Sequence, residues 1–169
     1  AFTSIGTEVY SMPPDPLTAQ CKVVDQLGEG EIYVLVTRGN YNCAVFGELF
    51  ATAVQGRKGA GVLLDAYSRD MKALKEMDFP LFYRGKNPKT SKGRCEINEC
   101  QIPVTIDGVT ICPGDYIFGD VDGVVIIPKA VVAEVIQTAL DTIQKENEVR
   151  RRLRNGSSLQ QAYAEIGAI

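Results

Sequence analysis

The stretch GELFATAVQGRKGAGVLLDAYSRD, residues 47 to 70, predicts a helix followed by a strand. Two glycines separate its halves and lead into VLLD, an apolar run that fits a strand buried on both faces. The stretch opens with an acidic residue, Glu48, and closes with Arg69 and Asp70, so one apolar unit carries charge at both ends. Apolar residues of its helical half, together with Phe46 just before it, recur at the spacing of one helix face: Phe46, Leu49, Phe50 and Ala53.

The flanking sequence extends this unit in both directions. The run IYVLV at 32–36 predicts a strand before it, and a short helix from Asp70 leads to a further strand, FPLFY at 79–83. A loosely alternating strand at 2–11 and a helix beginning at Leu17 precede them. The alternation of strands with helices favours a parallel sheet covered by helices.

The second half of the chain changes character after the polar loop at 85–93. Short apolar runs alternate with turn signals, among them Asp107-Gly108, so this half is predicted to be antiparallel. Pro128 then begins a long helix, where proline occupies a tolerated first-turn position. The apolar stripe of that helix comprises Val132, Val135, Ile136, Ala139, Leu140 and Ile143.

A last small helix is expected after Asn155, with Ser157 and Gln160 forming a capping box. We therefore predict an α/β fold in which residues 1–154 form a single compact domain, with a mixed sheet flanked by helices. Residues 155–169 are predicted to form a C-terminal helical tail that packs on this body or on a neighbouring subunit.

Composition bounds the function of this 169-residue chain. Its net charge of -3 and its pI near 5.1 argue against a nucleic-acid partner, because binding to phosphate backbones needs a basic surface. No apolar run approaches the roughly 18 residues that span a bilayer, so no membrane partner is expected and the cytoplasm is the simplest compartment. All five cysteines are expected to be reduced thiols in the core.

The absence of histidine narrows the chemistry further. It excludes Ser/His/Asp and Cys/His catalysis, and it removes the commonest proton shuttle and transition-metal ligand. Any catalysis must therefore use carboxylates, arginine, lysine, tyrosine, backbone groups or a hard metal ion.

Glu48 and the pair Arg69-Asp70 are expected on one edge of the sheet, because loops at the carboxyl ends of parallel strands gather where α/β folds bind ligands. The first helical turn after Gly47 offers unpaired NH groups to a carboxylate or phosphate. Arg69 adds a planar cation, and the two carboxylates are hard ligands for Mg or Mn. This combination could bind a 2-oxo acid and stabilise the enolate formed when its C3 to C4 bond breaks.

Each of these residues also has a simpler interpretation. An adjacent Arg-Asp pair is more often a surface ion pair, and Glu48 alone could complement the helix dipole. Asp120 and Asp122 could ligate a metal, but turn chemistry explains them better. Schiff-base chemistry needs a desolvated lysine, and nothing in the local pattern buries the candidates Lys58, Lys72 and Lys75.

Glu48, twenty intervening residues and then Arg69-Asp70 resemble the signature of the RraA-like family, which includes 4-hydroxy-4-methyl-2-oxoglutarate aldolases and regulators of ribonuclease E activity. Family members usually carry a further N-terminal segment, and a chain that starts at Ala1 leaves open whether that segment is absent, cleaved or not included. Six blocks are similar to the aldolase branch, in the same order: GELFATAV, GAGVLLDAYSRD, ALKEMDFPLFYRG, IPVTIDGVTICPGD, GDVDGVVIIP and ENEVRRRLRNGSSLQQAYAEIG.

The resemblance implies a swivelling β/β/α-type fold, assembled as homotrimers or dimers of trimers with active sites at subunit interfaces. It implies that Asp70 binds Mg or Mn directly and that Glu48 holds metal-bound water. Many relatives have Asp where this chain has the longer Glu48. Arg69 would contact the keto or carboxylate oxygens of the substrate and support the enolate.

Further roles follow from the same resemblance. The NH groups of Leu49 and Phe50 would receive the substrate carboxylate, with Gly47 permitting close approach. A glutamate from the long helix of the neighbouring subunit, either Glu146 or Glu148, would reach the site.

The resemblance thus implies a class II, divalent-metal-dependent pyruvate aldolase. Such an enzyme cleaves a 4-hydroxy-2-oxo acid, for example 4-hydroxy-4-methyl-2-oxoglutarate, to pyruvate, and decarboxylation of oxaloacetate through the same enolate is a second expected activity. Asp70 favours the enzyme, because the regulators often lack the acidic residue after the arginine. The alternatives are a non-catalytic, protein-binding regulator of ribonuclease E type and a small-anion sensor.

Overall fold

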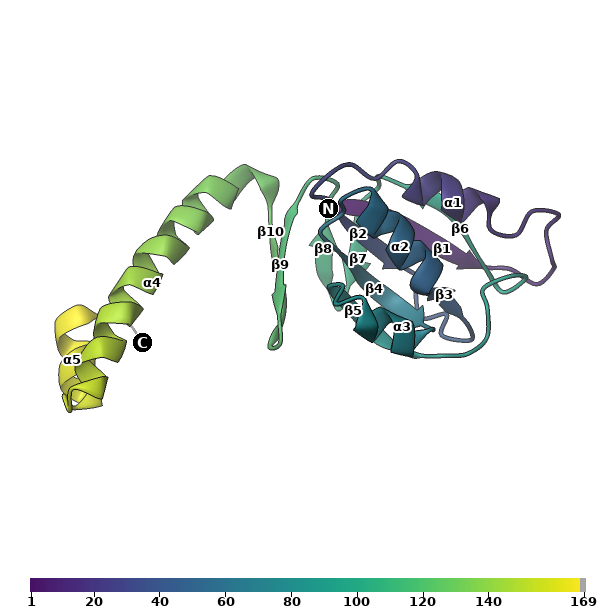
Figure 1. Cartoon of the computed structure of the whole chain (residues 1–169). Helices are drawn as coiled ribbons and strands as arrows, with labels where there is room; N and C mark the ends of the chain where they lie inside the picture. Colours follow the sequence, from purple (N-terminus) through teal and green to yellow (C-terminus); the bar gives the residue numbers. More distant parts are fainter. Residues whose placement is uncertain (168–169) are drawn as a thin grey trace. The chain divides into compact units, whose positions relative to one another are not determined.

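The protein, represented by a computed structural model, is described over residues 1–167 and divides into two compact units, one from Ala1 to Ile126 and one from Ile127 onward. Within that described part, a six-stranded mixed sheet forms the centre of the first unit (Figure 1). Five strands run parallel and β6 runs antiparallel to β1, which confirms the predicted mixed α/β class. The strands are β1 Phe2–Glu8, β2 Ile32–Val36, β3 Ala44–Phe46, β4 Gly61–Ser68, β5 Leu81–Lys86 and β6 Cys95–Cys100.

Three helices pack over one face of the sheet: α1 Thr18–Val24, α2 Glu48–Gly56 and α3 Met71–Glu76 (Figure 1). The predicted alternation of strands and helices is therefore confirmed. The main core lies beneath them, where Tyr33, Phe46 and Val54 are buried among other apolar side chains.

A smaller apolar cluster around Val34, Val104 and Ile111 lies on the other face of the sheet. The antiparallel hairpin of β7 Val104–Ile106 and β8 Val109–Ile111 covers it, and β9 Tyr116–Asp120 pairs with β10 Gly123–Ile127. The β7 to β8 turn is Asp107-Gly108, as predicted, and both residues have positive φ, which suits a two-residue hairpin turn.

Two strands were not predicted from the sequence pattern. β3 has only three residues, and its last residue, Phe46, was predicted to begin the helical stripe instead. β6, with the sequence CEINEC, lacks the apolar run that predicts a strand, yet it pairs with β1 at the edge of the sheet. Pairing with an existing strand decides both cases, and pairing is a tertiary property that local composition does not carry.

The predicted apolar stripe of α2 is also wrong in part. The helix buries Ala51 and Val54, whereas Leu49 is 75% exposed. In α1 the buried face includes Gln20, whose side-chain amide donates to the carbonyl oxygen of Val45 at 2.7 Å, so a polar residue is buried with its hydrogen bond satisfied.

All five cysteines are free thiols, as predicted. The prediction that all of them are core residues is wrong, because Cys21 and Cys112 are exposed. Cys43 and Cys95 are buried, and desolvation raises the pKa of the Cys95 thiol to about 12.

The second unit consists of a short 3-10 turn, Lys129–Val131, the long helix α4 Val132–Arg154 and the helix α5 Leu159–Ile166. The long helix begins just after Pro128, as predicted. The last helix is capped by Ser158, which accepts from the NH of Gln161, so the predicted cap at Ser157 is one residue too early. The predicted boundary at 154/155 falls between α4 and α5, which contact each other within this unit.

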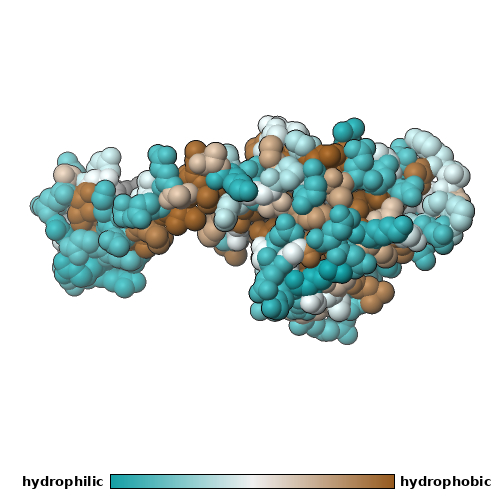
Figure 2. Space-filling model, turned by 90° about the horizontal axis from the view of Figure 1, so that it is seen from above, coloured by the Kyte–Doolittle hydropathy of each residue, from teal (hydrophilic) through white to brown (hydrophobic). Residues whose placement is uncertain are grey.

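The apolar stripe predicted for α4 is accessible along its length, and Figure 2 shows apolar side chains gathered on the long helix. Val135, Ile136, Leu140 and Ile143 are between 39% and 50% exposed. No helix within residues 1–167 combines the length and apolar character needed to cross a membrane.

Candidate functional site

The carboxyl ends of β3 and β4 bring the residues of the opening stretch together. The two strands pair in parallel, with Phe46 opposite Ser68. The NH of Arg69 donates to the carbonyl oxygen of Phe46 at 3.0 Å, so the chain leaves both strands at the same point. Gly47 and Glu48 follow one strand, and Arg69 and Asp70 follow the other.

Asp70 links the two segments through its side chain. Its Oδ2 atom accepts a hydrogen bond from the NH of Glu48 at 3.2 Å, and the Nε of Arg69 lies 3.7 Å from the same oxygen. Its Oδ1 atom has no partner within residues 1–167. The backbone of Asp70 is left-handed, with φ of 60° and ψ of 34°, a conformation that aspartate tolerates better than most residues. The fold thus holds one carboxylate oxygen and leaves the other open.

Gly47 provides the space that this arrangement needs. Its φ of -166° is extended backbone open to any residue, so its conformation does not require glycine. A Cβ at this position would lie 2.4 Å from Oδ2 of Asp70 and 3.1 Å from Cγ of Arg69. Glycine therefore permits close approach of these two side chains, a reason that the sequence pattern did not supply.

The first turn of α2 faces the same place. The NH groups of Leu49 and Phe50 have no acceptor within the described residues, and the cap residue Gly47 provides no side-chain oxygen. Phe50 is partly buried and stacks on Phe46, with ring centroids 6.1 Å apart, which anchors this end of the helix. Free NH groups at a helix N-terminus favour an anionic ligand.

A pocket of about 580 Å³ joins these groups. The sequence-predicted residues Glu48, Leu49, Arg69 and Asp70 line it, whereas Gly47 and Phe50 are not among its lining residues. Ala73 and Glu76 of α3, and Met77 just after it, complete the lining and were missed by sequence reasoning. Their spacing from Asp70, three, six and seven residues along a helix, is the signal that could have identified them.

The carboxylates suit a hard divalent cation. Glu48 uses Oε1 to accept from Thr52 at 3.0 Å, and among the described residues its other oxygen has no partner, nor has Oδ1 of Asp70. Oxygen donors of this kind are the ligands that Mg and Mn prefer. No group of three or more metal-binding side chains occurs within residues 1–167, so such an ion would need water, substrate or another chain to complete its ligands.

Gly47→Ala is expected to weaken Mn²⁺ binding about 10- to 100-fold, because the new methyl group would displace the carboxylate of Asp70. Titration of Mn²⁺ followed by electron paramagnetic resonance measures this affinity. Gly56→Ala in the same helix is the control, because a Cβ there meets nothing within 4 Å. Parent-like affinity in Gly47→Ala, with parent-like stability, would contradict the role of this glycine.

The other candidate residues lie outside this pocket. Asp120 accepts from the NH of Asp122 at 2.9 Å, which supports the turn interpretation of that pair. The Nζ atom of Lys58 lies 3.0 Å from Glu29 on the surface, and Lys72 and Lys75 are exposed.

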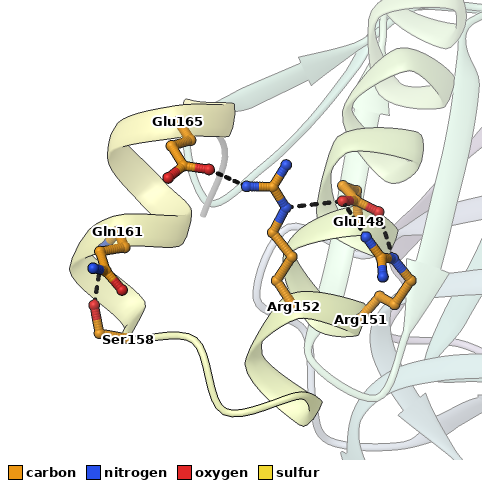
Figure 3. Close-up of polar contacts among 6 residues, drawn as sticks. All are labelled: Glu148, Arg151, Arg152, Ser158, Gln161 and Glu165. Carbon is orange, nitrogen blue, oxygen red and sulfur yellow. Dashed lines mark hydrogen bonds and ion pairs between the residues drawn. The ribbon is translucent and has the colours of Figure 1, made fainter.

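The two candidate glutamates of α4 differ in their surroundings, and Figure 3 shows those of Glu148. Glu148 accepts from Arg151 at 2.7 and 2.8 Å and from Arg152 at 2.9 Å, and these hydrogen bonds lower its pKa to about 2. Arg152 in turn binds Glu165 of α5. Within residues 1–167, the one ion pair of Glu146 is with Arg150 at 3.8 Å. Arg152 therefore joins the two helices of this unit and also binds Glu148, whereas Glu146 has the weaker ion pair of the two glutamates.

The first unit is thus a mixed α/β protein with a pocket at the carboxyl edge of its sheet, lined by the carboxylates of Glu48, Asp70 and Glu76 and by the guanidinium of Arg69. The sequence model of the RraA-like family, described as Aldolase/RraA, matches residues 10–126, and the chain belongs to this family. The predicted family resemblance is confirmed.

One relative, from Halalkalibacterium halodurans, carries the provisional name 4-hydroxy-4-methyl-2-oxoglutarate aldolase. It is 34% identical over 79% of this chain and 63% of its own length. The chain likewise spans less than two thirds of a relative from Methanocaldococcus jannaschii, 60%, and of one from Legionella pneumophila, 23%.

Two crystal structures share the fold. An uncharacterized protein from Pseudomonas syringae has a TM-score of 0.82 and 29% identity, over 98% of this chain and 76% of its own. RraAS2 from Streptomyces coelicolor, described as an unusual member of the RNase ES inhibitor RraA protein family, has a TM-score of 0.72 and 26% identity, over 89% and 76%. Among these similar proteins, one is thus named as an aldolase and another as a member of a ribonuclease inhibitor family.

Proposed function

We propose that this chain is a divalent-metal-dependent lyase that cleaves a 4-hydroxy-2-oxo acid to pyruvate. The observation that carries the proposal is the carboxylate of Asp70, fixed through one oxygen beside the guanidinium of Arg69, with the other oxygen open to a pocket at the N-terminus of α2. The aldolase name of a relative supports the same reaction class.

In this proposal the NH groups of Leu49 and Phe50 bind the C1 carboxylate, and Arg69 donates to the C2 keto oxygen. Mg or Mn, held by Asp70 directly and by Glu48 through water, would supply Lewis-acid withdrawal of charge from that oxygen. A base takes the proton of the 4-hydroxyl group, the C3 to C4 bond breaks, and its electron pair remains on the enolate of pyruvate. C4 leaves as a carbonyl, and C3 then takes up a proton. Arg69 stays beside the enolate oxygen throughout.

We also propose that the active assembly is a homotrimer or a dimer of trimers, in which α4 contacts another copy. The accessible apolar stripe of α4 supports an additional contact, because exposed apolar side chains in a row are typical of interaction surfaces. Glu146 is the better candidate for the carboxylate supplied by the second copy, since both oxygens of Glu148 already bind arginines.

Pyruvate release tests the reaction class. With 4-hydroxy-4-methyl-2-oxoglutarate or oxaloacetate, we expect release with Mg or Mn and a fall of about tenfold or more on addition of EDTA. A coupled lactate dehydrogenase assay measures it, and excess metal should restore the rate. Because free metal ions also decarboxylate oxaloacetate, the control is metal without protein. EDTA-insensitive release would contradict metal dependence.

A protein-binding regulator of ribonuclease E type is the second candidate, and similarity to the Streptomyces inhibitor favours it. In that case the pocket is a former active site that no longer catalyses a reaction. The absence of metal-dependent pyruvate release from every 2-oxo acid tried, together with inhibition of a ribonuclease E activity, would favour this candidate over the lyase.

A further inference from the structure

Each of the two carboxylates proposed as metal ligands is held through one of its oxygens. Asp70 uses Oδ2 to accept from the NH of Glu48 at 3.2 Å, and Glu48 uses Oε1 to accept from the hydroxyl group of Thr52 at 3.0 Å. Thr52 thus donates to Glu48, and Glu48 donates to Asp70. This chain of hydrogen bonds leaves Oε2 of Glu48 and Oδ1 of Asp70 without a partner among the described residues.

Thr52 lies one helical turn after Glu48 in α2. Side chains at this spacing share a face of the helix and lean toward its N-terminus, so the hydroxyl group of Thr52 reaches back to Glu48. Thr52 is exposed and is not among the residues that line the pocket, so it can act on a ligand there only through Glu48. Because both partners belong to one helix, the contact does not depend on a second copy of the chain.

The hydrogen bond from Thr52 restricts a long and otherwise mobile side chain. Glutamate is among the side chains that lose the most rotamer freedom when they become ordered. Glu48 is half-buried and has no ion pair within residues 1–167, so Thr52 is the one described residue that orients its carboxylate. A group that is oriented in advance loses less entropy when a ligand binds, and the ligand therefore binds more tightly.

We propose that Thr52 is a positioning residue of the metal site, whose hydroxyl group orients Glu48 so that Oε2 is available to water bound to Mg or Mn. The inference rests on the proposed function, in which Glu48 holds such a water molecule. Loss of a hydrogen-bond partner behind a metal ligand typically lowers metal affinity about 10- to 100-fold. Because Thr52 is exposed and Glu48 acts through water, the effect should fall at the lower end of this range.

Titration of Mn²⁺ into the full chain, followed by electron paramagnetic resonance, tests this role without turnover. Thr52→Val removes the hydroxyl group at similar shape and should weaken Mn²⁺ binding about tenfold. Thr52→Ser keeps the hydroxyl group and should stay within about twofold of the parent. Thr18→Val is the matched control, since Thr18 is exposed on α1 and its hydroxyl group has no hydrogen bond within residues 1–167.

A Glu48→Ala background separates positioning from a general disturbance of the helix. Glu48→Ala alone should weaken Mn²⁺ binding at least as much as Thr52→Val does. Adding Thr52→Val to it should then change the affinity by less than about twofold, because the group that Thr52 orients is gone. Parent-like affinity in Thr52→Val would overturn the positioning role, and so would a loss of the same size in both backgrounds.

The positioning role and the lyase function fail in different ways. Mn²⁺ binding that depends on Thr52, in a protein that releases no pyruvate from any 2-oxo acid tried, would refute the lyase function and leave the positioning role standing. Metal-dependent pyruvate release, together with Mn²⁺ binding that Thr52→Val leaves unchanged, would refute the positioning role alone. A parent protein that binds no Mn²⁺ would overturn both.

Discussion

An Asp70→Asn variant is expected to lose about 100-fold or more in kcat and to lose its response to Mg or Mn. The side chain keeps its shape and can still accept the hydrogen bond from the NH of Glu48 through its amide oxygen. What it loses is the negative charge that a hard cation requires. Pyruvate release against metal concentration measures the effect, and thermal unfolding should show a stability close to that of the parent.

Asparagine is the informative replacement because of the backbone at this position. Asp70 has left-handed φ and ψ, which asparagine tolerates and which cost alanine about 1–2 kcal/mol. A loss of activity in Asp70→Ala could therefore arise from a shifted loop. Asp78→Asn is the control, since Asp78 is also exposed, has a φ of 48° and lies outside the pocket. Turnover and metal response at parent levels in Asp70→Asn would exclude the proposed metal ligand.

The sheet could be predicted where a strand is a continuous apolar run. IYVLV and VLLD become β2 and β4, each buried between two layers, so local hydrophobicity and tertiary position agree. The turn at Asp107-Gly108 could be predicted because its residues themselves favour positive φ. β3 and β6 could not, because each depends on a partner strand that is distant in the sequence.

The position of the site on the sheet could be predicted from the sequence, but the conformation and contacts of its residues could not. The rule that parallel strands gather their carboxyl-end loops correctly brought Glu48, Arg69 and Asp70 to one edge. The rule does not give the left-handed backbone of Asp70 or the close approach to Gly47, since both depend on how β3 and β4 pair. Glu76 was missed because its helix has only six residues and its other charged positions are solvated.

Arg69→Lys is expected to lower kcat/KM about 100-fold. Lysine keeps the positive charge and loses the planar pair of donors that can bind a carboxylate or enolate in two places. The side chain of Arg69 lies close against Gly47, because a Cβ there would be 3.1 Å from its Cγ and 3.3 Å from its Nε, and its Nε lies 3.7 Å from Asp70. A flexible ammonium group would not keep that position, so the loss should fall mainly on kcat.

The matched control is Arg57→Lys, since Arg57 pairs with Asp25 at 2.9 Å on the surface and exposed pairs contribute little. A kcat/KM of Arg69→Lys within about twofold of the parent would argue against its role. The double variant Asp70→Asn with Arg69→Lys adds a sharper test. If both groups stabilise charge on the same enolate oxygen, the second change should cost far less in the presence of the first. Fully additive losses would mean that the two side chains act on separate steps, and their adjacency in the pocket would then not reflect a shared role.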